Sequence, residues 1–300
     1  MNKVIITGGN GLVGSRIVEL LSEKYEFDKA SRETGINIAA RQDVLNFFKG
    51  SSADWVIHLA AKADVDGCEL DKSSDLNKIG QKNFDWENSQ SAYGVNVYGT
   101  KNVISAANET NKKIIYISTD FVFSGEKEEP YSEEDVPNPI NWYASTKYLG
   151  EEDVKKNAKK YIIARIAYPY RPAFPKKDFV RAIIGRFESG QEVLAVKDHI
   201  MTPTFIDDIA NAWDKLIEND SSGIFHVVGA SYVSPLEIAR KISEAFNFDK
   251  RKISETTRKQ FFLGRAPRPF HLALRNDKIA KLGTRMKTFD QGLLEVKNNL

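Results

Sequence analysis

A tyrosine and a lysine four positions apart, Tyr143 and Lys147, form the pair of side chains in this sequence that best suits proton transfer. Positions i and i+4 share one face of a helix, so the ammonium can lie beside the phenol. A free phenol titrates at about pH 10, and a neighbouring cation stabilises the phenolate and lowers that pKa. The pair therefore predicts a general acid or base in which Tyr143 gives or takes the proton.

A second hydroxyl precedes this helix at the end of the apolar run Ile114–Ser118. Thr119 can hydrogen-bond a substrate carbonyl or hydroxyl and hold it for hydride transfer while Tyr143 exchanges the proton. Thr119, Tyr143 and Lys147 are therefore the predicted catalytic residues.

A glycine-rich turn between a strand and a helix supplies the expected cofactor site. Thr7–Gly14 follows the apolar run Val4–Ile6 and precedes a helix that should begin near Leu12. Glycine allows a sharp turn, close approach of a pyrophosphate and tight packing of the helix on the strand. The helix N-terminus adds free N–H groups and a positive dipole end. The predicted phosphate cradle consists of Gly8, Asn10, Gly11, Leu12, Val13 and Gly14.

The choice between two dinucleotides depends on the end of the second strand, expected from Tyr25 to about Ala30. Counting about 20 residues from the glycines reaches Asp28, whose carboxylate would accept from a ribose hydroxyl and favour NAD. Aligning the strand end by pattern instead brings Ser31 and Arg32 to that place, and a guanidinium would pair with a 2′-phosphate. We expect NADP(H) as the preferred cofactor, with NAD(H) possible.

The elements that carry these residues alternate between short β-branched runs and amphipathic stretches up to Ile166. This alternation predicts an α/β fold: a doubly wound parallel (Rossmann) sheet with a smaller C-terminal substrate-binding lobe. The expected dinucleotide-binding domain spans residues 1–168, with 204–229 returning to it, and the lobe spans 169–203 and 230–300. The polar stretch Asp71–Ser91 favours a surface insertion over an active-site flap.

Composition narrows the class of partner. With 43 basic and 41 acidic residues the formal net charge is only +2, which favours a small molecule over nucleic acid or a membrane surface. Cys68 is the single cysteine, which excludes an intramolecular disulfide and fits a reducing cytoplasm. The four histidines show no metal-ligand spacing, so no metal is expected. No leader or membrane span is expected. We expect the protein to be a monomer or a homodimer.

Several motifs together resemble the extended short-chain dehydrogenases/reductases, and within that group the dTDP-4-dehydrorhamnose reductases. The matching segments are Thr7–Gly14, Leu59–Ala61, Val95–Thr100, Ser118–Phe123, Asn138–Tyr143, Lys147–Glu151, Thr202–Thr204 and Arg268–Pro269. The resemblance covers nearly the whole chain. It implies NADPH-dependent reduction of the 4-keto group of a nucleotide-activated deoxysugar.

The resemblance also implies roles for individual positions. Thr119, Phe121 and Tyr168 would contact the sugar, although Phe121 stands where the family usually has a tyrosine. Asn96 would stabilise the helix beside the catalytic residues and is also expected among the cofactor-binding residues. The implied cofactor contacts add Asn37 and Ile38 near the adenine, Leu59, Ala60, Ala61 and Lys62 toward the nicotinamide, and Ser118, Tyr143 and Lys147.

Two other functions are compatible with the same sequence. A nucleotide-sugar epimerase or dehydratase would keep NAD bound and recycle it. A non-catalytic NADP-binding regulatory subunit, related to the partner of methionine adenosyltransferase, would use the fold for binding alone.

Overall fold

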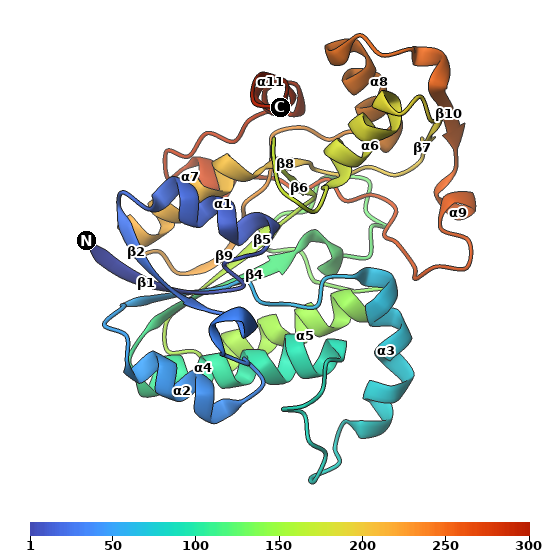
Figure 1. The fold of residues 1–300 in the computed structure, drawn as a ribbon. Helices are drawn as coiled ribbons and strands as arrows, with labels where there is room; N and C mark the ends of the chain where they lie inside the picture. Colours follow the sequence, from blue (N-terminus) through green and yellow to red (C-terminus); the bar gives the residue numbers. More distant parts are fainter.

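Six strands pair in parallel to form the central sheet of the computed structural model, which describes residues 1–300 (Figure 1). The strand order is β2-β1-β3-β4-β5-β9. The strands are β1 (Asn2–Thr7), β2 (Tyr25–Ala30), β3 (Trp55–His58), β4 (Lys113–Thr119), β5 (Tyr161–Ile166) and β9 (Gly223–His226). The order reverses beside β1, and in such sheets ligands bind at that point, outside the carboxyl ends of the strands.

Helices cover both faces of the sheet, because successive side chains of a strand point to opposite sides. Ile6 packs in the core under α1 (Leu12–Leu21) and α7 (Ile206–Glu218), with the fully buried Trp213 of α7. Ile5 packs in the core on the opposite face of the sheet, which contains side chains of three further helices. These helices are α2 (Arg41–Lys49), α4 (Thr100–Glu109) and α5 (Trp142–Asn157). The predicted doubly wound fold is confirmed.

A smaller lobe with its own core lies beyond β5, at the upper right of Figure 1. Buried Tyr170, Ile184, Ile242 and Phe289 belong to this core. Its helices are α6 (Phe179–Glu188), α8 (Pro235–Phe246) and α11 (Phe289–Asn298), with the shorter α9 (Arg258–Phe261) and α10 (Asp277–Ala280) nearby. Its strands form two parallel pairs, β7 (Val193–Val196) with β10 (Ile253–Thr256) and β6 (Pro169–Tyr170) with β8 (Thr204–Phe205).

The stretch expected to be a surface insertion begins inside a helix, and most of its residues are exposed. Helix α3 (Val65–Lys78) packs against α5, and Asp75 on it is fully buried. Trp86, in the following loop, is buried as well. The sequence pattern misses this helix because α3 meets its neighbours largely through carboxylates, with Cys68 as its one fully buried apolar side chain.

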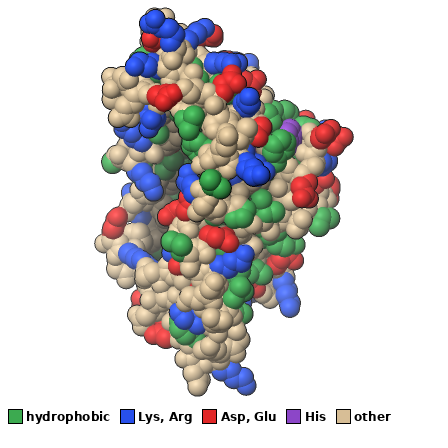
Figure 2. Space-filling model, turned by 90° about the vertical axis from the view of Figure 1, so that its right-hand side faces the viewer, with side chains coloured by type: hydrophobic (Ala, Val, Ile, Leu, Met, Phe, Trp, Pro, Cys, Tyr) green, Lys and Arg blue, Asp and Glu red, His purple; other side chains and the backbone are tan.

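Single helical turns join the larger elements near the sheet's carboxyl edge. They are η1 (Arg32–Thr34), the π-helical turn η2 (Gly94–Gly99), η3 (Asp120–Val122) and, in the lobe, η4 (Lys250–Lys252). Figure 2 shows basic, acidic and hydrophobic side chains interspersed over one face of the molecule. No helix combines the length and the apolar character needed to cross a bilayer.

Candidate active site

The three predicted catalytic residues line one cavity of about 610 Å³ at the carboxyl ends of the strands. Thr119 ends β4, Tyr143 is the second residue of α5, and Lys147 follows one turn later. Helix α5 starts at a defined place because the Asn141 side chain accepts a hydrogen bond from the Ala144 N–H, at 2.9 Å. This cap fixes the position at which Tyr143 enters the cavity.

Burial controls the protonation of the catalytic pair. Desolvation raises the pKa of Tyr143, and a hydrogen bond with the Thr119 hydroxyl opposes that shift. The phenol is therefore protonated at neutral pH, which is the state that a proton donor needs. Burial lowers the pKa of Lys147 to about 7, with Glu151 opposing the shift.

The expected lowering of the phenol pKa by Lys147 is not seen in the protein alone. The Lys147 ammonium lies over the ring of Tyr116, 4.1 Å from its centroid. The Tyr116 hydroxyl in turn donates to the Lys147 carbonyl, at 3.1 Å. Tyr116 therefore holds Lys147 in place through both contacts. Desolvation remains the largest influence on the pKa of Tyr143.

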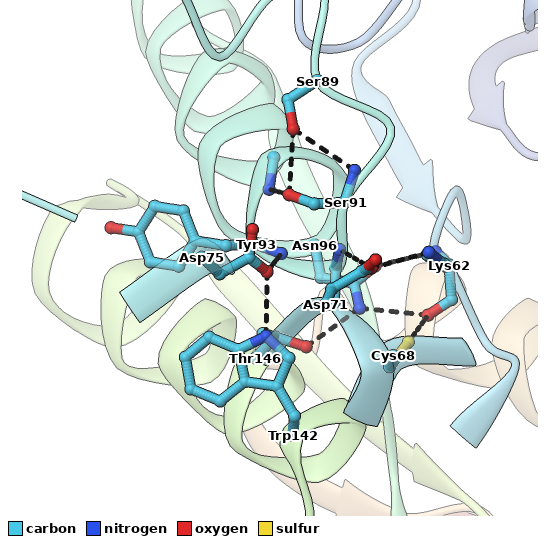
Figure 3. Close-up of polar contacts among 12 residues, drawn as sticks. Lys62, Cys68, Asp71, Asp75, Ser89, Ser91, Tyr93, Asn96, Trp142 and Thr146 are labelled. Atoms are coloured by element: carbon cyan, nitrogen blue, oxygen red, sulfur yellow. Dashed lines mark hydrogen bonds and ion pairs between the residues drawn. The ribbon is translucent and has the colours of Figure 1, made fainter. Parts of the chain in front are cut away.

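A polar network behind the cavity ties α3 to the start of α5 (Figure 3). Asp75 accepts from the indole N–H of Trp142 at 2.8 Å and from the Tyr93 backbone N–H at 3.0 Å. Asp71 pairs with the Lys62 ammonium at 2.6 Å. Two carboxylates of α3 therefore fix the residue that precedes Tyr143 and a residue that lines the cofactor cavity.

Asn96 joins this network from the π-helical turn η2, also visible in Figure 3. Its side chain bonds both the N–H and the carbonyl of Lys62, at 2.8 and 3.0 Å, and the Thr146 hydroxyl at 3.0 Å. Asn96 does not line either cavity of the site. Asn96 therefore links Lys62, which lines the cofactor cavity, to Thr146 of α5.

Most of the predicted cofactor residues line two adjoining cavities. The first, of about 740 Å³, is bounded by Gly8, Asn10, Gly11, Ser31, Arg32, Ile38, Leu59, Ala60, Ala61 and Lys62. The second, which contains the catalytic residues, adds Leu12, Val13, Gly14 and Ser118. Asn37 lines neither cavity, because its amide donates to the Glu87 carbonyl at 2.9 Å.

The glycine turn has the shape that a dinucleotide requires. Gly8 has a φ of 71°, and a Cβ on it would lie 2.8 Å from the Ala60 nitrogen. A Cβ on Gly14 would lie 2.5 Å from the Gly8 carbonyl oxygen. Helix α1 begins at Leu12 as expected, and no side chain caps its N-terminus, so its N–H groups are free to bind phosphate. The residues of this turn therefore fit the pyrophosphate of a dinucleotide cofactor.

The two candidates for contact with the adenosine ribose are separated by the structure. Ser31 and Arg32 line the first cavity. Asp28, two residues before the end of β2, lies outside both cavities and accepts from the Ser51 hydroxyl at 2.5 Å. This arrangement favours Arg32 over Asp28 as the group that meets the cofactor. Glu33 also lines the cavity and is hydrogen-bonded to Asn10.

Aromatic side chains form the substrate side of the second cavity. The ring of Phe121 meets the rings of Tyr143 and Tyr168 edge to face, with centroids 6.2 and 6.1 Å apart. Tyr168 has a φ of 41°, a conformation that a non-glycine residue adopts only when its surroundings hold it. The His199 ring provides one such hold, 2.8 Å from the Tyr168 hydroxyl.

Several cavity residues are absent from the sequence-based prediction. Among them are Gln90 on the cofactor side and Asp120, Phe174, Lys176 and Lys177 on the catalytic side. Asp120 directly follows Thr119 in the segment Ser118–Phe123, so its place in the sequence could have indicated that it lines the cavity. The two lysines lie in a proline-broken segment without periodicity and offered none.

A doubly wound sheet whose cofactor cavity opens onto a Thr–Tyr–Lys group defines an oxidoreductase of the extended short-chain dehydrogenase/reductase type. The family model described as "RmlD substrate binding domain" matches residues 1–300. The chain belongs to that family.

Individual relatives cover almost the whole chain. The spore coat polysaccharide biosynthesis protein SpsK of Bacillus subtilis is 30% identical over 298 residues, covering 98% of this chain and 96% of that protein. A dTDP-4-dehydrorhamnose reductase of Bacillus anthracis, solved in complex with NADP, is 30% identical, with a TM-score of 0.87 and 100% of both chains covered. Methionine adenosyltransferase 2 subunit beta of Xenopus tropicalis is 27% identical, covering 98% of this chain and 86% of that protein.

Proposed function

We propose that this protein reduces the 4-keto group of a nucleotide-activated deoxysugar with NADPH, as the name of its Bacillus anthracis structural relative implies for that enzyme. The observation that carries the proposal is that Thr119, Tyr143 and Lys147 line the same cavity as the glycine turn. Bound NADPH would supply the hydride. The chain's own residues hold the cofactor, orient the carbonyl and deliver the proton.

The role proposed for each residue follows from its position in the site. The N–H groups of the turn and of α1 would hold the pyrophosphate, and Arg32 would pair with the 2′-phosphate. Thr119 hydrogen-bonds the substrate oxygen and fixes it within reach of Tyr143. The protonated phenol then gives up its proton as charge develops on that oxygen. Lys147 lines the same cavity, and its ammonium would stabilise the phenolate that forms once Tyr143 has given up its proton.

The substrate class is supported by the lining of the second cavity. Phe121 and Tyr168 offer flat aromatic faces against which a sugar ring packs. Lys176 and Lys177 line the same cavity and carry the charge needed for a diphosphate. The second cavity therefore complements both ends of a nucleotide sugar.

The direct test is turnover. Purified protein with NADPH and a dTDP-4-keto-6-deoxyhexose should lose the absorbance of the reduced nicotinamide, in proportion to the sugar added. Protein that binds NADPH but oxidises none of it with any 4-keto nucleotide sugar would reject the proposal.

A second candidate is a regulatory subunit that binds NADP without catalysis. The observation in its favour is the similarity to methionine adenosyltransferase 2 subunit beta over 98% of the chain. The intact Thr119, Tyr143 and Lys147 weigh against it. Binding of NADPH without turnover, together with capture of a methionine adenosyltransferase, would make this candidate the leading one.

Tightly retained NAD in the purified protein would instead indicate an epimerase or dehydratase.

A further inference from the structure

Asp120 is a buried carboxyl group in the wall of the catalytic cavity, and the roles assigned so far do not use it. It follows Thr119 at the end of β4 and is 2% exposed. One oxygen, Oδ1, lies 2.9 Å from Thr119 Oγ1. The other, Oδ2, is buried without a hydrogen-bond partner.

The surroundings of Asp120 favour its neutral form. The groups that stabilise its charge are the Thr119 hydroxyl and the backbone N–H groups of Asp120 and Phe121, with no cation among them. A buried carboxylate without a cation and with an unsatisfied oxygen is costly. Desolvation accordingly raises the pKa of Asp120 to about 7.

A neutral Asp120 must place its acid proton on an acceptor. Its backbone partners are N–H groups, which only donate. Thr119 Oγ1 is therefore the acceptor available to it at 2.9 Å. The protonation of Asp120 thus decides the direction of the hydrogen bond between the two side chains.

That direction determines what Thr119 can offer to a substrate. A hydroxyl has one proton and two lone pairs, and the Phe121 N–H already occupies one lone pair at 3.2 Å. When Asp120 is ionised, it takes the single Thr119 proton. When Asp120 is neutral and donates, both lone pairs of Thr119 are filled and its own proton is free to point into the cavity. Tyr143 then also finds no acceptor on Thr119, so its proton turns to the substrate as well.

We propose that Asp120 is a positioning residue whose neutral carboxyl group directs the Thr119 hydroxyl proton toward the substrate carbonyl. The inference rests on the proposed reductase function and adds to it a residue that controls the donor. No covalent step is involved: the acid proton stays between Asp120 and Thr119 throughout.

Other titratable groups face Asp120 and must be separated from it. Tyr143 and Lys147 approach from α5 and share its cavity. Tyr168 approaches from the segment after β5, with His199 bonded to its hydroxyl and Arg268 nearby. Lys147 is the main rival, because its pKa is also lowered to about 7. Rising pH would ionise Asp120 or neutralise Lys147 over the same range.

The experiment is a pH profile of kcat/KM from pH 6 to 9 for the wild type and Asp120→Asn, with NADPH affinity measured by fluorescence titration at each pH. Wild-type kcat/KM should fall about tenfold or more above pH 7, because one hydrogen-bond donor to the reacting oxygen is lost. The amide of Asp120→Asn is a permanent donor, so the fall should be clearly smaller, with only the part due to neutralisation of Lys147 remaining. NADPH affinity should keep the wild-type pH dependence.

Thr119→Val provides a second variant that keeps Asp120 but removes the hydroxyl it acts through. Its lower kcat/KM should likewise fall less above pH 7 than that of the wild type. A fall of wild-type size in both variants would assign the titration to Lys147 and overturn the inference while leaving the reductase function intact. A wild type that binds NADPH without turnover would reject the proposed function, and the inference with it.

Discussion

At the scale of single residues, the proposed proton transfer depends on the Tyr143 phenol. Tyr143→Phe removes the proton donor and keeps the ring that packs against Phe121, so kcat should drop by about 10²- to 10⁴-fold. NADPH affinity should stay near that of the wild type. Steady-state kinetics and a binding titration measure the two effects. Tyr148→Phe, on the same helix but outside the cavity, is the matched control, and equal turnover in both variants would remove Tyr143 from the mechanism.

Arg32 determines the choice of cofactor if its guanidinium meets the 2′-phosphate. Arg32→Ala should then raise the KM for NADPH more than the KM for NADH, because only NADPH carries that phosphate. Arg41→Ala provides the control, since Arg41 is exposed on α2 and lies outside the cavity. An equal rise in both KM values would show that cofactor preference is set elsewhere.

The meeting of Thr119, Tyr143 and Lys147 in one cavity could be predicted because their spacing is a local property. A strand that ends in Thr119 and a helix that begins near Tyr143 bring the two hydroxyls together at one sheet edge. Their protonation could not be predicted, since it depends on burial. The lowered pKa of Lys147 and the raised pKa of Asp120 come mainly from desolvation by residues distant in the sequence.

At the scale of elements, the strand–turn–helix units were predictable and α3 was not. The glycine turn carries its own constraints, so α1 begins where the sequence indicates. Helix α3 gives no apolar period because three of its carboxylates face inward. Glu69 accepts from the Trp142 N–H at 2.7 Å, and Asp71 and Asp75 bond Lys62 and Trp142. Such pairings are visible only once the partner elements are in place.

The contact between α3 and α5 yields a prediction of its own. Asp75→Ala would leave the Trp142 indole N–H and the Tyr93 N–H buried without an acceptor, so the free energy of unfolding should fall by about 2 kcal/mol or more. Because Trp142 precedes Tyr143, kcat should fall as well, while the KM for NADPH should change little. Urea unfolding and steady-state kinetics check both expectations.

Two variants make the Asp75 experiment specific. Asp75→Asn keeps an acceptor oxygen and should recover most of the lost stability and turnover. Asp85→Ala, at an exposed position of the same stretch, should leave both near the wild-type values. If the alanine and asparagine variants of Asp75 behaved alike, the hydrogen bonds to Trp142 and Tyr93 would not be what holds α5 in place.

At the scale of the whole molecule, buried ionisable groups join the sheet to the segments around it. The ion pair of Glu151 with Arg165 is almost fully buried, at 2.7 and 2.9 Å, and links α5 to β5. His226 on the neighbouring β9 faces the same guanidinium, with Nε2 3.4 Å from Arg165 Nη1 and Nδ1 3.2 Å from the Arg275 carbonyl. The imidazole therefore donates at Nδ1 and must keep Nε2 unprotonated to meet the cation.

The pH dependence of stability follows from three such histidines. Burial lowers the pKa of His58 to about 3, of His199 to about 4 and of His226 to about 3, whereas an unfolded imidazole titrates at about pH 6.5. Below pH 6.5 the unfolded chain binds protons that the folded protein excludes, so the free energy of unfolding should fall as pH drops toward 4, by up to about 1.4 kcal/mol per pH unit for each histidine. Urea unfolding at several pH values measures this fall. His226→Gln keeps an oxygen for Arg165 but cannot be protonated, so its fall should be shallower than that of the wild type, while His271→Gln, at a partly exposed position, is the control. A fall of equal steepness in His226→Gln and the wild type would mean that other groups, not the buried imidazole beside Arg165, determine acid sensitivity.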